Sequence, residues 1–223
     1  MRVRVPPQAP QKGLLKKCSL SKIIQTVPET TNYLKHQNAN PIQKYLIDNF
    51  YNELFAVIKP LRPIKVLDVG CGEGFTLKKL NEKKIGKTIT GIDNSLSAIE
   101  LGKKLYPELN LARGDVYKLD FSDNEFDLVI CTEVLEHLEF PEKAVEEIKR
   151  VSKKYIVFSV PNEPFFILAN FLRGKYLKSF GNHPEHINHW TFFGFRKFLK
   201  KQGLTILKRK YPFAWSLALT KKP

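Results

Sequence analysis

The sequence predicts an α/β protein in which a mostly parallel β-sheet is covered by helices on both faces. Three observations support this fold class. Short apolar runs alternate with segments of helical period between residues 64 and 160, a glycine-rich turn follows the first run, and single aspartates lie at or just after the ends of the first three. Each helical crossover returns the chain to the same end of the sheet, which makes the neighbouring strands parallel.

The first expected helix covers residues 41–58. Apolar residues recur there at every fourth position from Ile42 to Ile58, and prolines follow at positions 60 and 63. Residues 1–30 show no sustained period, so we expect a poorly ordered arm. We therefore divide the chain into an N-terminal arm and helix, residues 1–60, and a main domain, residues 61–223.

Five strands and three helices are expected to alternate along the next hundred or so residues. The strands are expected at residues 64–69, 88–92, 109–112, 126–131 and 155–160, and the helices at 75–80, 96–105 and 141–151. Ser95 is the expected cap of the second helix, and Pro141 occupies the first turn of the third.

The last third of the chain departs from this alternation. Residues 161–190 form an insertion between the fifth strand and the following helix that is too long for an ordinary connection, which indicates a functional lid. A helix over residues 191–201 follows, with Gly203 just past its end. Residues 204–207 and 213–219 are expected to form two strands antiparallel to one another.

Composition bounds the class of protein. Apolar residues make up 43% and charged residues 26% of the chain, as in globular proteins, and no apolar stretch has the length that a membrane span requires. Prolines at positions 6, 7 and 10 interrupt the segment where a signal peptide needs an apolar run. Three scattered cysteines do not make a disulfide framework. We therefore expect a cytoplasmic protein without a transmembrane segment.

The charge is unevenly distributed in a chain of net charge +15. Lys and Arg number 14 against 17 Asp and Glu in residues 61–150, and 14 against 2 in residues 151–223. The acidic middle indicates a pocket for a ligand that is cationic or rich in hydrogen-bond donors, bordered by surfaces that attract anions. The alternative is a lysine-rich solvated surface without a binding role.

The sharpest motif is the glycine loop VLDVGCGEGF at residues 66–75. Glycines between a buried strand and a helix let the backbone turn sharply and let a ligand approach closely. The spacing G-x-G-x-G differs from that of dinucleotide sites, and Glu73 places a carboxylate where a pyrophosphate would dock. An uncharged or cationic ligand fits this loop better.

Three aspartates are expected at one edge of the sheet, because ligands of open α/β sheets bind at the carboxyl ends of the strands. They are Asp68 in the first strand, Asp93 after the second and Asp115 after the third. S-adenosylmethionine carries an ammonium, a sulfonium, a ribose diol and an adenine amine, and it has no phosphate. Carboxylates that accept hydrogen bonds therefore suit it well.

At these residues the chain resembles the class I S-adenosylmethionine-dependent methyltransferases, over roughly residues 60–220. The segment TEVLEHL at residues 132–138 is similar to the one after the fourth strand in the methyltransferase type 11 group, which includes ubiquinone-pathway O-methyltransferases. The resemblance implies a Rossmann-like sheet of seven strands whose last strand is antiparallel. It also implies the residues that bind the cofactor S-adenosylmethionine: Asp68, Gly70, Cys71, Gly72, Gly74, Asp93 on the ribose, Asn94, Asp115 and Val116 on the adenine, Thr132 and Glu133.

Methyl transfer from a sulfonium is an in-line displacement, so the enzyme mainly has to align the reacting atoms. If the acceptor is a hydroxyl, a nearby base raises its reactivity, and histidines suit this role at neutral pH. His137 follows the fourth strand, and His183, His186 and His189 cluster after the insertion. We take His137, His186 and His189 as the candidate catalytic residues, although single histidines are often structural.

A metal-assisted alternative involves some of the same residues. Glu133, Glu136, His137 and His186 resemble the metal-binding set of the small-RNA 2′-O-methyltransferases, and mixed carboxylate and imidazole ligation suits a divalent ion. However, Glu-x-x-Glu-His is also common in type 11 enzymes that use no metal. In that interpretation Glu133 lines the cofactor site and Glu136 is an exposed helix residue. We expect no metal.

The insertion bears on the acceptor. Residues 165–198 hold eight of the sixteen phenylalanines, and basic residues follow the apolar run 165–172. Such a segment could cover an apolar acceptor, rest on an anionic membrane surface, stack on nucleic acid, or simply pack as a core helix. We expect methyl transfer to an oxygen of a small-molecule or lipid-like acceptor. The alternatives are an RNA methyltransferase and a non-catalytic regulatory protein that binds S-adenosylmethionine.

Overall fold

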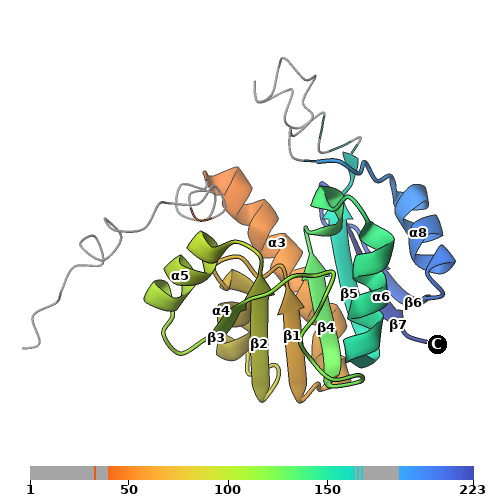
Figure 1. Cartoon of the computed structure of the whole chain (residues 1–223). Helices are drawn as coiled ribbons and strands as arrows, with labels where there is room; N and C mark the ends of the chain where they lie inside the picture. The colour runs from red at the N-terminus through yellow and green to blue at the C-terminus, as the bar shows by residue number, and fades with distance from the viewer. Residues whose placement is uncertain (1–32, 34–39, 164, 166, 168–185) are drawn as a thin grey trace, which may run out of the picture.

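The structure is a computed structural model that describes residues 33, 40–163, 165, 167 and 186–223 (Figure 1). The expected N-terminal arm, most of the expected lid and His183 lie outside the described residues. Among the helices that are described, none combines the length and apolar character that crossing a membrane would require.

Seven strands form one sheet in the order β3-β2-β1-β4-β5-β7-β6. Neighbours from β3 to β5 pair in parallel, whereas β7 is antiparallel to both β5 and β6. This confirms the predicted seven-stranded, mostly parallel sheet with an antiparallel last strand. The strands are β1 Lys65–Val69, β2 Thr88–Asp93, β3 Asn110–Arg113, β4 Phe126–Thr132, β5 Ser152–Pro161, β6 Thr205–Lys210 and β7 Trp215–Lys221.

The last two strands begin one and two residues later than predicted. A turn separates them, in which the Trp215 amide donates to the Pro212 carbonyl at 2.8 Å and Ala214 adopts a positive φ of 70°. The turn therefore takes up Phe213 and Ala214, which the sequence alone assigned to a strand.

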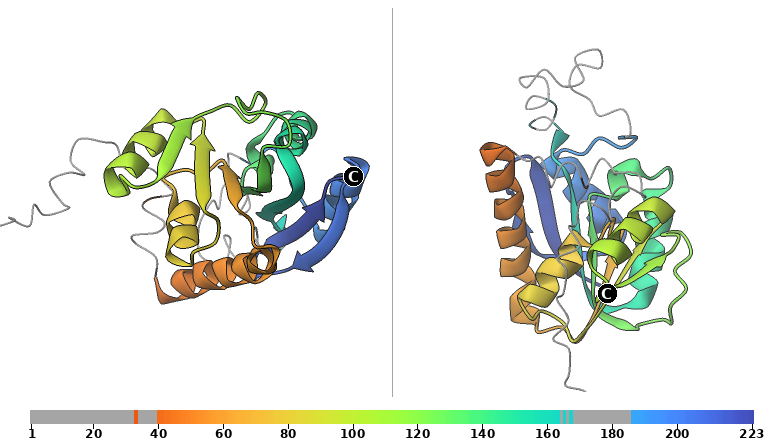
Figure 2. Two further views of the ribbon diagram at one scale, coloured as in Figure 1. Left: turned by 90° about the horizontal axis from the view of Figure 1, so that it is seen from below. Right: turned by 90° about the vertical axis from the view of Figure 1, so that its left-hand side faces the viewer.

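Within the described residues, five helices cover the sheet and two short 3₁₀ helices lie in its connections. They are α3 Pro41–Ile58, α4 Phe75–Glu82, α5 Leu96–Leu105, α6 Pro141–Val151 and α8 Phe192–Lys201, with η1 Lys59–Leu61 and η2 Leu135–His137. Side chains of α3 and α4 share one buried core with β1, and those of α6 and α8 share the other. Figure 2 shows α3 and α6 on opposite faces of the sheet, as expected for helices on both faces.

Helix α3 is buried over only part of its length. The four-residue repeat predicts one continuous apolar face, and Phe50, Leu54 and Ile58 on that face are buried. Ile42, at the start of the same repeat, is 71% exposed. The Asn40 side chain caps the helix by accepting from the Gln43 amide. The first turns of the helix therefore form without burial in the core. Side chains of α3 pack in the same core as those of β1. The division of the chain at residue 60 stays a prediction.

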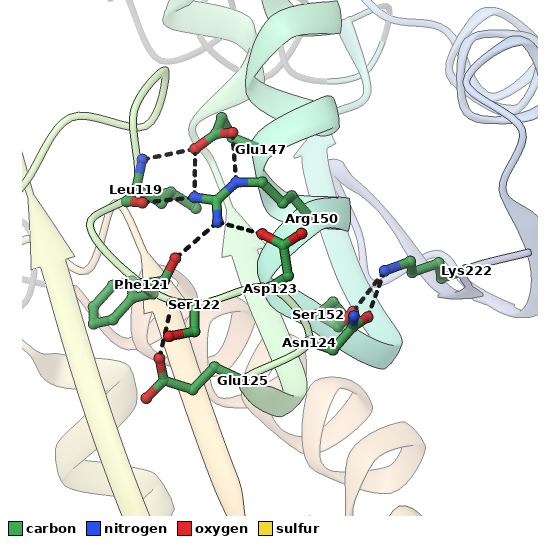
Figure 3. Close-up of polar contacts among 10 residues, drawn as sticks. All are labelled: Leu119, Phe121, Ser122, Asp123, Asn124, Glu125, Glu147, Arg150, Ser152 and Lys222. Carbon is green, nitrogen blue, oxygen red and sulfur yellow. Dashed lines mark hydrogen bonds and ion pairs between the residues drawn. The ribbon is translucent and has the colours of Figure 1, made fainter.

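The connection between β3 and β4 contains no helix, and Arg150 of α6 holds it in place (Figure 3). The guanidinium donates to the carbonyls of Leu119 and Phe121 at 2.7 Å each. It also pairs with Glu147 and Asp123 at 2.8 Å each. A planar donor with five N–H groups can satisfy all these acceptors at once. Arg150 thus fixes the segment that follows Asp115.

Candidate cofactor and acceptor site

The glycine loop is a tight turn that larger residues could not form. Gly70 and Gly72 have positive φ values of 75° and 54°, a conformation that favours glycine. A Cβ at Gly70 would also collide with Cγ2 of Val134. The amides of Gly70 and Cys71 donate to the Ile92 carbonyl at 2.8 and 2.9 Å, which ties the loop to β2.

Asp93 connects this loop to the start of α5. Its Oδ2 accepts from the Gly72 amide at 2.8 Å, and its Oδ1 accepts from the Ser95 amide at 2.8 Å. Ser95 caps α5, as predicted, by accepting from the Ala98 amide. Each carboxylate oxygen has a second lone pair, so the same side chain can still accept from the hydroxyls of a ribose.

Asp68 is nearly inaccessible and lies close enough to Asp93 for their charges to interact. It is 1% exposed, and its Oδ2 has no hydrogen-bond partner among the described residues. Burial, and secondarily the charge of Asp93, raise the pKa of Asp68 from 3.8 to about 8. The carboxyl is therefore protonated at neutral pH in the ligand-free protein.

Two further loop residues are buried. Burial, and secondarily the charge of Asp68, raise the pKa of the Cys71 thiol, so this residue lines the turn as a neutral group. Glu73 is 1% exposed, so its carboxylate lies inside the protein. The expectation that Glu73 places its carboxylate where a pyrophosphate would dock does not fit this burial. Sequence spacing locates the residue but not the direction of its side chain.

Asp115 lies two residues after the end of β3, at the same edge of the sheet as Asp93. It is exposed, and its Oδ1 accepts from the Tyr117 amide at 2.9 Å in a local turn. Val116 is half-buried and packs against the core beneath α6. Asn94 follows Asp93 and is exposed, and its carbonyl accepts from Nε of Arg113 at 3.3 Å.

Glu133 follows Thr132 at the end of β4 and is fixed by both carboxylate oxygens. Oε1 accepts from the Ser159 hydroxyl at 2.9 Å, and Oε2 accepts from the Trp215 indole at 2.6 Å. Glu133 also has a positive φ of 58°. The sequence analysis identified neither Ser159 nor Trp215, because these contacts join strands that are distant along the chain.

His186 is held by a buried carboxylate that the sequence analysis also missed. Oε1 of Glu163 lies 2.9 Å from Nδ1 of His186 and 3.5 Å from Nδ1 of His189. The side chains of Glu163 and His186 are each 5% exposed, whereas His189 is exposed. One feature of the sequence could have pointed to Glu163. It and Glu185 are the only acids in residues 151–223.

The structure brings Glu136, His137 and His186 together. Their candidate ligand atoms lie within 4.8 Å of one another, and the two imidazole rings are 5.0 Å apart. Glu136 is 1% exposed, which contradicts the interpretation of it as an exposed helix residue. Its burial follows from the chain after the insertion, because the amides of Ile187 and Asn188 donate to the Glu136 carbonyl and hold that segment over it.

A protein-family model described as a methyltransferase domain matches residues 67–158, which include the glycines of the loop, Asp93 and Glu133. Residues 67–158 of this chain therefore form a methyltransferase domain.

The methyltransferase domain has relatives among curated proteins. A ubiquinone biosynthesis O-methyltransferase of Alkalilimnicola ehrlichii is 30% identical over 145 residues, 57% of this chain and 58% of the relative. A demethylmenaquinone methyltransferase of Renibacterium salmoninarum is 34% identical over 89 residues, 40% of this chain and 37% of the relative. The chain thus spans between about a third and three fifths of the length of these curated relatives.

A solved structure shares the fold of the domain. The magnesium protoporphyrin IX methyltransferase of Synechocystis PCC 6803, solved with bound SAH, superposes with a TM-score of 0.65 at 17% identity. The match covers 87% of this chain and 95% of that chain. The predicted cofactor residues gather at the carboxyl ends of β1 to β4, and the rings of His137 and His186 lie edge to face. The individual roles of these residues stay predictions.

Proposed function

We propose that this protein transfers a methyl group from S-adenosylmethionine to an oxygen of a small-molecule or lipid-like acceptor. The observation that carries the proposal is the carboxylate of Asp93, which joins the glycine loop to the start of α5 through the amides of Gly72 and Ser95. This arrangement gives the cofactor a rigid acceptor for its ribose beside a turn that its backbone can approach. The similarity to a ubiquinone biosynthesis O-methyltransferase and a demethylmenaquinone methyltransferase supports an apolar acceptor.

The chemistry assigned to the chain is alignment and proton removal. In the proposal, the glycine loop, Asp93, Asp115 and Val116 hold the nucleoside, and Thr132 and Glu133 border the methyl group. Because Nδ1 of His186 lies 2.9 Å from Glu163, the carboxylate favours the tautomer in which Nδ1 carries the proton. Nε2 is then the basic nitrogen, which can accept the proton of an acceptor hydroxyl as the methyl group moves.

Calorimetric titration with S-adenosylmethionine tests the cofactor half of the proposal. We expect Asp93→Ala to abolish measurable binding, while Asp48→Ala, at an exposed position of α3, binds like the wild type. Equal binding by the wild type and Asp93→Ala would refute the assignment. His186→Ala should bind the cofactor normally and transfer methyl groups slowly. Binding without transfer across a broad acceptor panel would instead favour a non-catalytic regulatory protein.

A second candidate function, metal-assisted ribose 2′-O-methylation of RNA, is favoured by the cluster of Glu136, His137 and His186. The fourth member of the resembling set, Glu133, lies outside this group of candidate ligand atoms and accepts from Ser159 and Trp215. An RNA oligonucleotide as acceptor, with and without a chelator, distinguishes the two functions. RNA binding that falls steeply with added salt and transfer that requires a divalent ion would support this candidate. Cytoplasmic location stays a prediction under either function.

A further inference from the structure

Several apolar side chains are strongly exposed around the acceptor side of the molecule. Together they form what we call the apolar rim. It comprises Ile42 and Tyr45 of α3, Phe165 after β5, Phe193 of α8, and Tyr211 and Phe213 in the turn between β6 and β7. Their exposed fractions run from 44% to 79%. So many large apolar groups on one side of a protein mark an interaction surface.

The members of the rim that follow β5 lie together because of the sheet register. Pro161 at the end of β5 pairs with Trp215 at the start of β7, so the turn before β7 lies beside the chain that leaves β5. The ring of Phe165 is accordingly 6.4 Å from that of Phe213. Phe192, next to Phe193, bridges the remainder of the cluster, 6.0 Å from Phe165 and 4.7 Å from Tyr211.

The exposed start of α3 lies toward the same end of the strands as this cluster (Figure 1). The ring of Phe50 contacts that of Trp215 at 5.4 Å, which places the middle of α3 at the level where β7 begins. Ile42 lies eight residues earlier, about 12 Å further along the helix axis. Figure 1 shows α3 beginning at the edge of the sheet where β5 ends and α8 starts. Ile42 and Tyr45 therefore belong to the same side of the molecule.

The charge around the rim is positive. Residues 186–223 contain no Asp or Glu. Arg196 of α8 and Arg209 of β6 line a hollow together with Phe192 and Tyr211 of the aromatic cluster. Lys44 is exposed between Ile42 and Tyr45. Apolar side chains bordered by cationic side chains match a partner that has an anionic outer layer over an apolar interior.

We propose that the apolar rim rests on an anionic lipid bilayer. A bilayer fits better than RNA because Ile42 is aliphatic and offers no face on which a base could stack. The rim also adjoins the acceptor site, since Phe165 lies two residues after Glu163, and Phe213 lies two residues before the Trp215 that holds Glu133. A lipid-like acceptor would then enter from the membrane directly, and to this extent the inference rests on the proposed function.

Co-sedimentation with vesicles tests the inference. We use vesicles of phosphatidylcholine alone and of phosphatidylcholine mixed with phosphatidylglycerol. The wild type should sediment with the mixed vesicles, and added salt should weaken binding. Phe193→Ser and Ile42→Ser should each lower the partition coefficient about tenfold, because each removes a large apolar side chain from the bilayer contact. The matched control is Ile64→Ser, since Ile64 is also exposed but precedes β1 at the opposite edge of the sheet. It should bind like the wild type.

Three results would overturn the inference. The wild type could fail to sediment with the mixed vesicles, the control Ile64→Ser could lose binding as much as the rim variants, or an RNA oligonucleotide could bind in a manner that depends on Phe193 and displace the vesicles. Transfer to a water-soluble acceptor is measured in parallel without vesicles. Transfer without vesicle binding defeats only this inference, whereas vesicle binding without transfer defeats only the proposed function.

Discussion

Replacing Asp68 with asparagine should change how the stability of the protein depends on pH. Burial, and secondarily the charge of Asp93, raise the pKa of Asp68 from 3.8 to about 8 in the folded protein. Between these two values the native state keeps a proton that the unfolded chain releases. Asparagine has nearly the same shape and does not titrate, so it removes this effect with little change in packing.

The sign and size follow from proton linkage. Because the native state binds more protons than the unfolded state in this window, the free energy of unfolding falls as the pH rises, by up to about 1.4 kcal/mol per pH unit. The stabilising contribution is complete below the unfolded pKa and is lost by about pH 8. Between about pH 5.5 and about pH 8 the loss sums to about 3 kcal/mol.

Urea unfolding of the ligand-free wild type and of Asp68→Asn at these two pH values measures the effect. The difference between their free energies of unfolding should shift by about 3 kcal/mol in favour of the variant at the higher pH. Groups that titrate elsewhere cancel in this difference. Asp48→Asn, at an exposed position, serves as the control and should show no such shift. A difference for Asp68→Asn that stays the same at both pH values would refute the reasoning.

Three further substitutions test other parts of the structure. Arg150→Ala should lower the free energy of unfolding by about 2 kcal/mol, because two carbonyls and Glu147 lose their donor. This value is already reduced for solvent screening, since the Arg150 side chain is 31% exposed. Urea unfolding measures the loss. Gly102→Ala should lower the free energy of unfolding by about 1–3 kcal/mol in the same assay, because the new Cβ would lie 2.6 Å from the Glu73 carbonyl oxygen. Glu163→Gln should slow methyl transfer about tenfold and leave cofactor binding unchanged, as seen in single-turnover kinetics and calorimetry, because the amide holds His186 less firmly; a weaker cofactor affinity would contradict this assignment.

Most of the fold could be predicted because local patterns report it directly. The α6 boundaries, residues 141–151, were predicted without error, since proline marks the first turn and the apolar period runs through the helix. The turn before β7 could not be predicted, because it depends on a positive φ at Ala214, a residue type that rarely adopts it. The exposure of the start of α3 could not be predicted for another reason. A repeat identifies an apolar face, but the sheet decides how much of it is covered.

The two halves of the site were predictable to different degrees. The glycine loop and Asp93 belong to one continuous unit of strand, turn, helix and strand, so sequence spacing suffices to bring them together. The acceptor side is assembled from distant segments. Glu163 and His186 are 23 residues apart, so sequence spacing does not predict their contact. The interpretation without a metal makes Glu136 an exposed helix residue, whereas residues 187 and 188 pack over it.

The acidity of the cofactor site has a consequence that charge counting along the sequence does not reveal. Burial of Asp68, and secondarily the charge of Asp93, favour the protonated carboxyl at neutral pH, so Asp68 holds a proton until a cation replaces it. In the proposed function that cation is the ammonium or sulfonium of S-adenosylmethionine. Cofactor binding should then expel a proton, and below about pH 8 the affinity should fall by up to about tenfold per pH unit. Calorimetry in buffers of different ionisation enthalpy detects this proton. A heat of binding that is independent of the buffer would show that Asp68 does not exchange its proton for the cofactor charge.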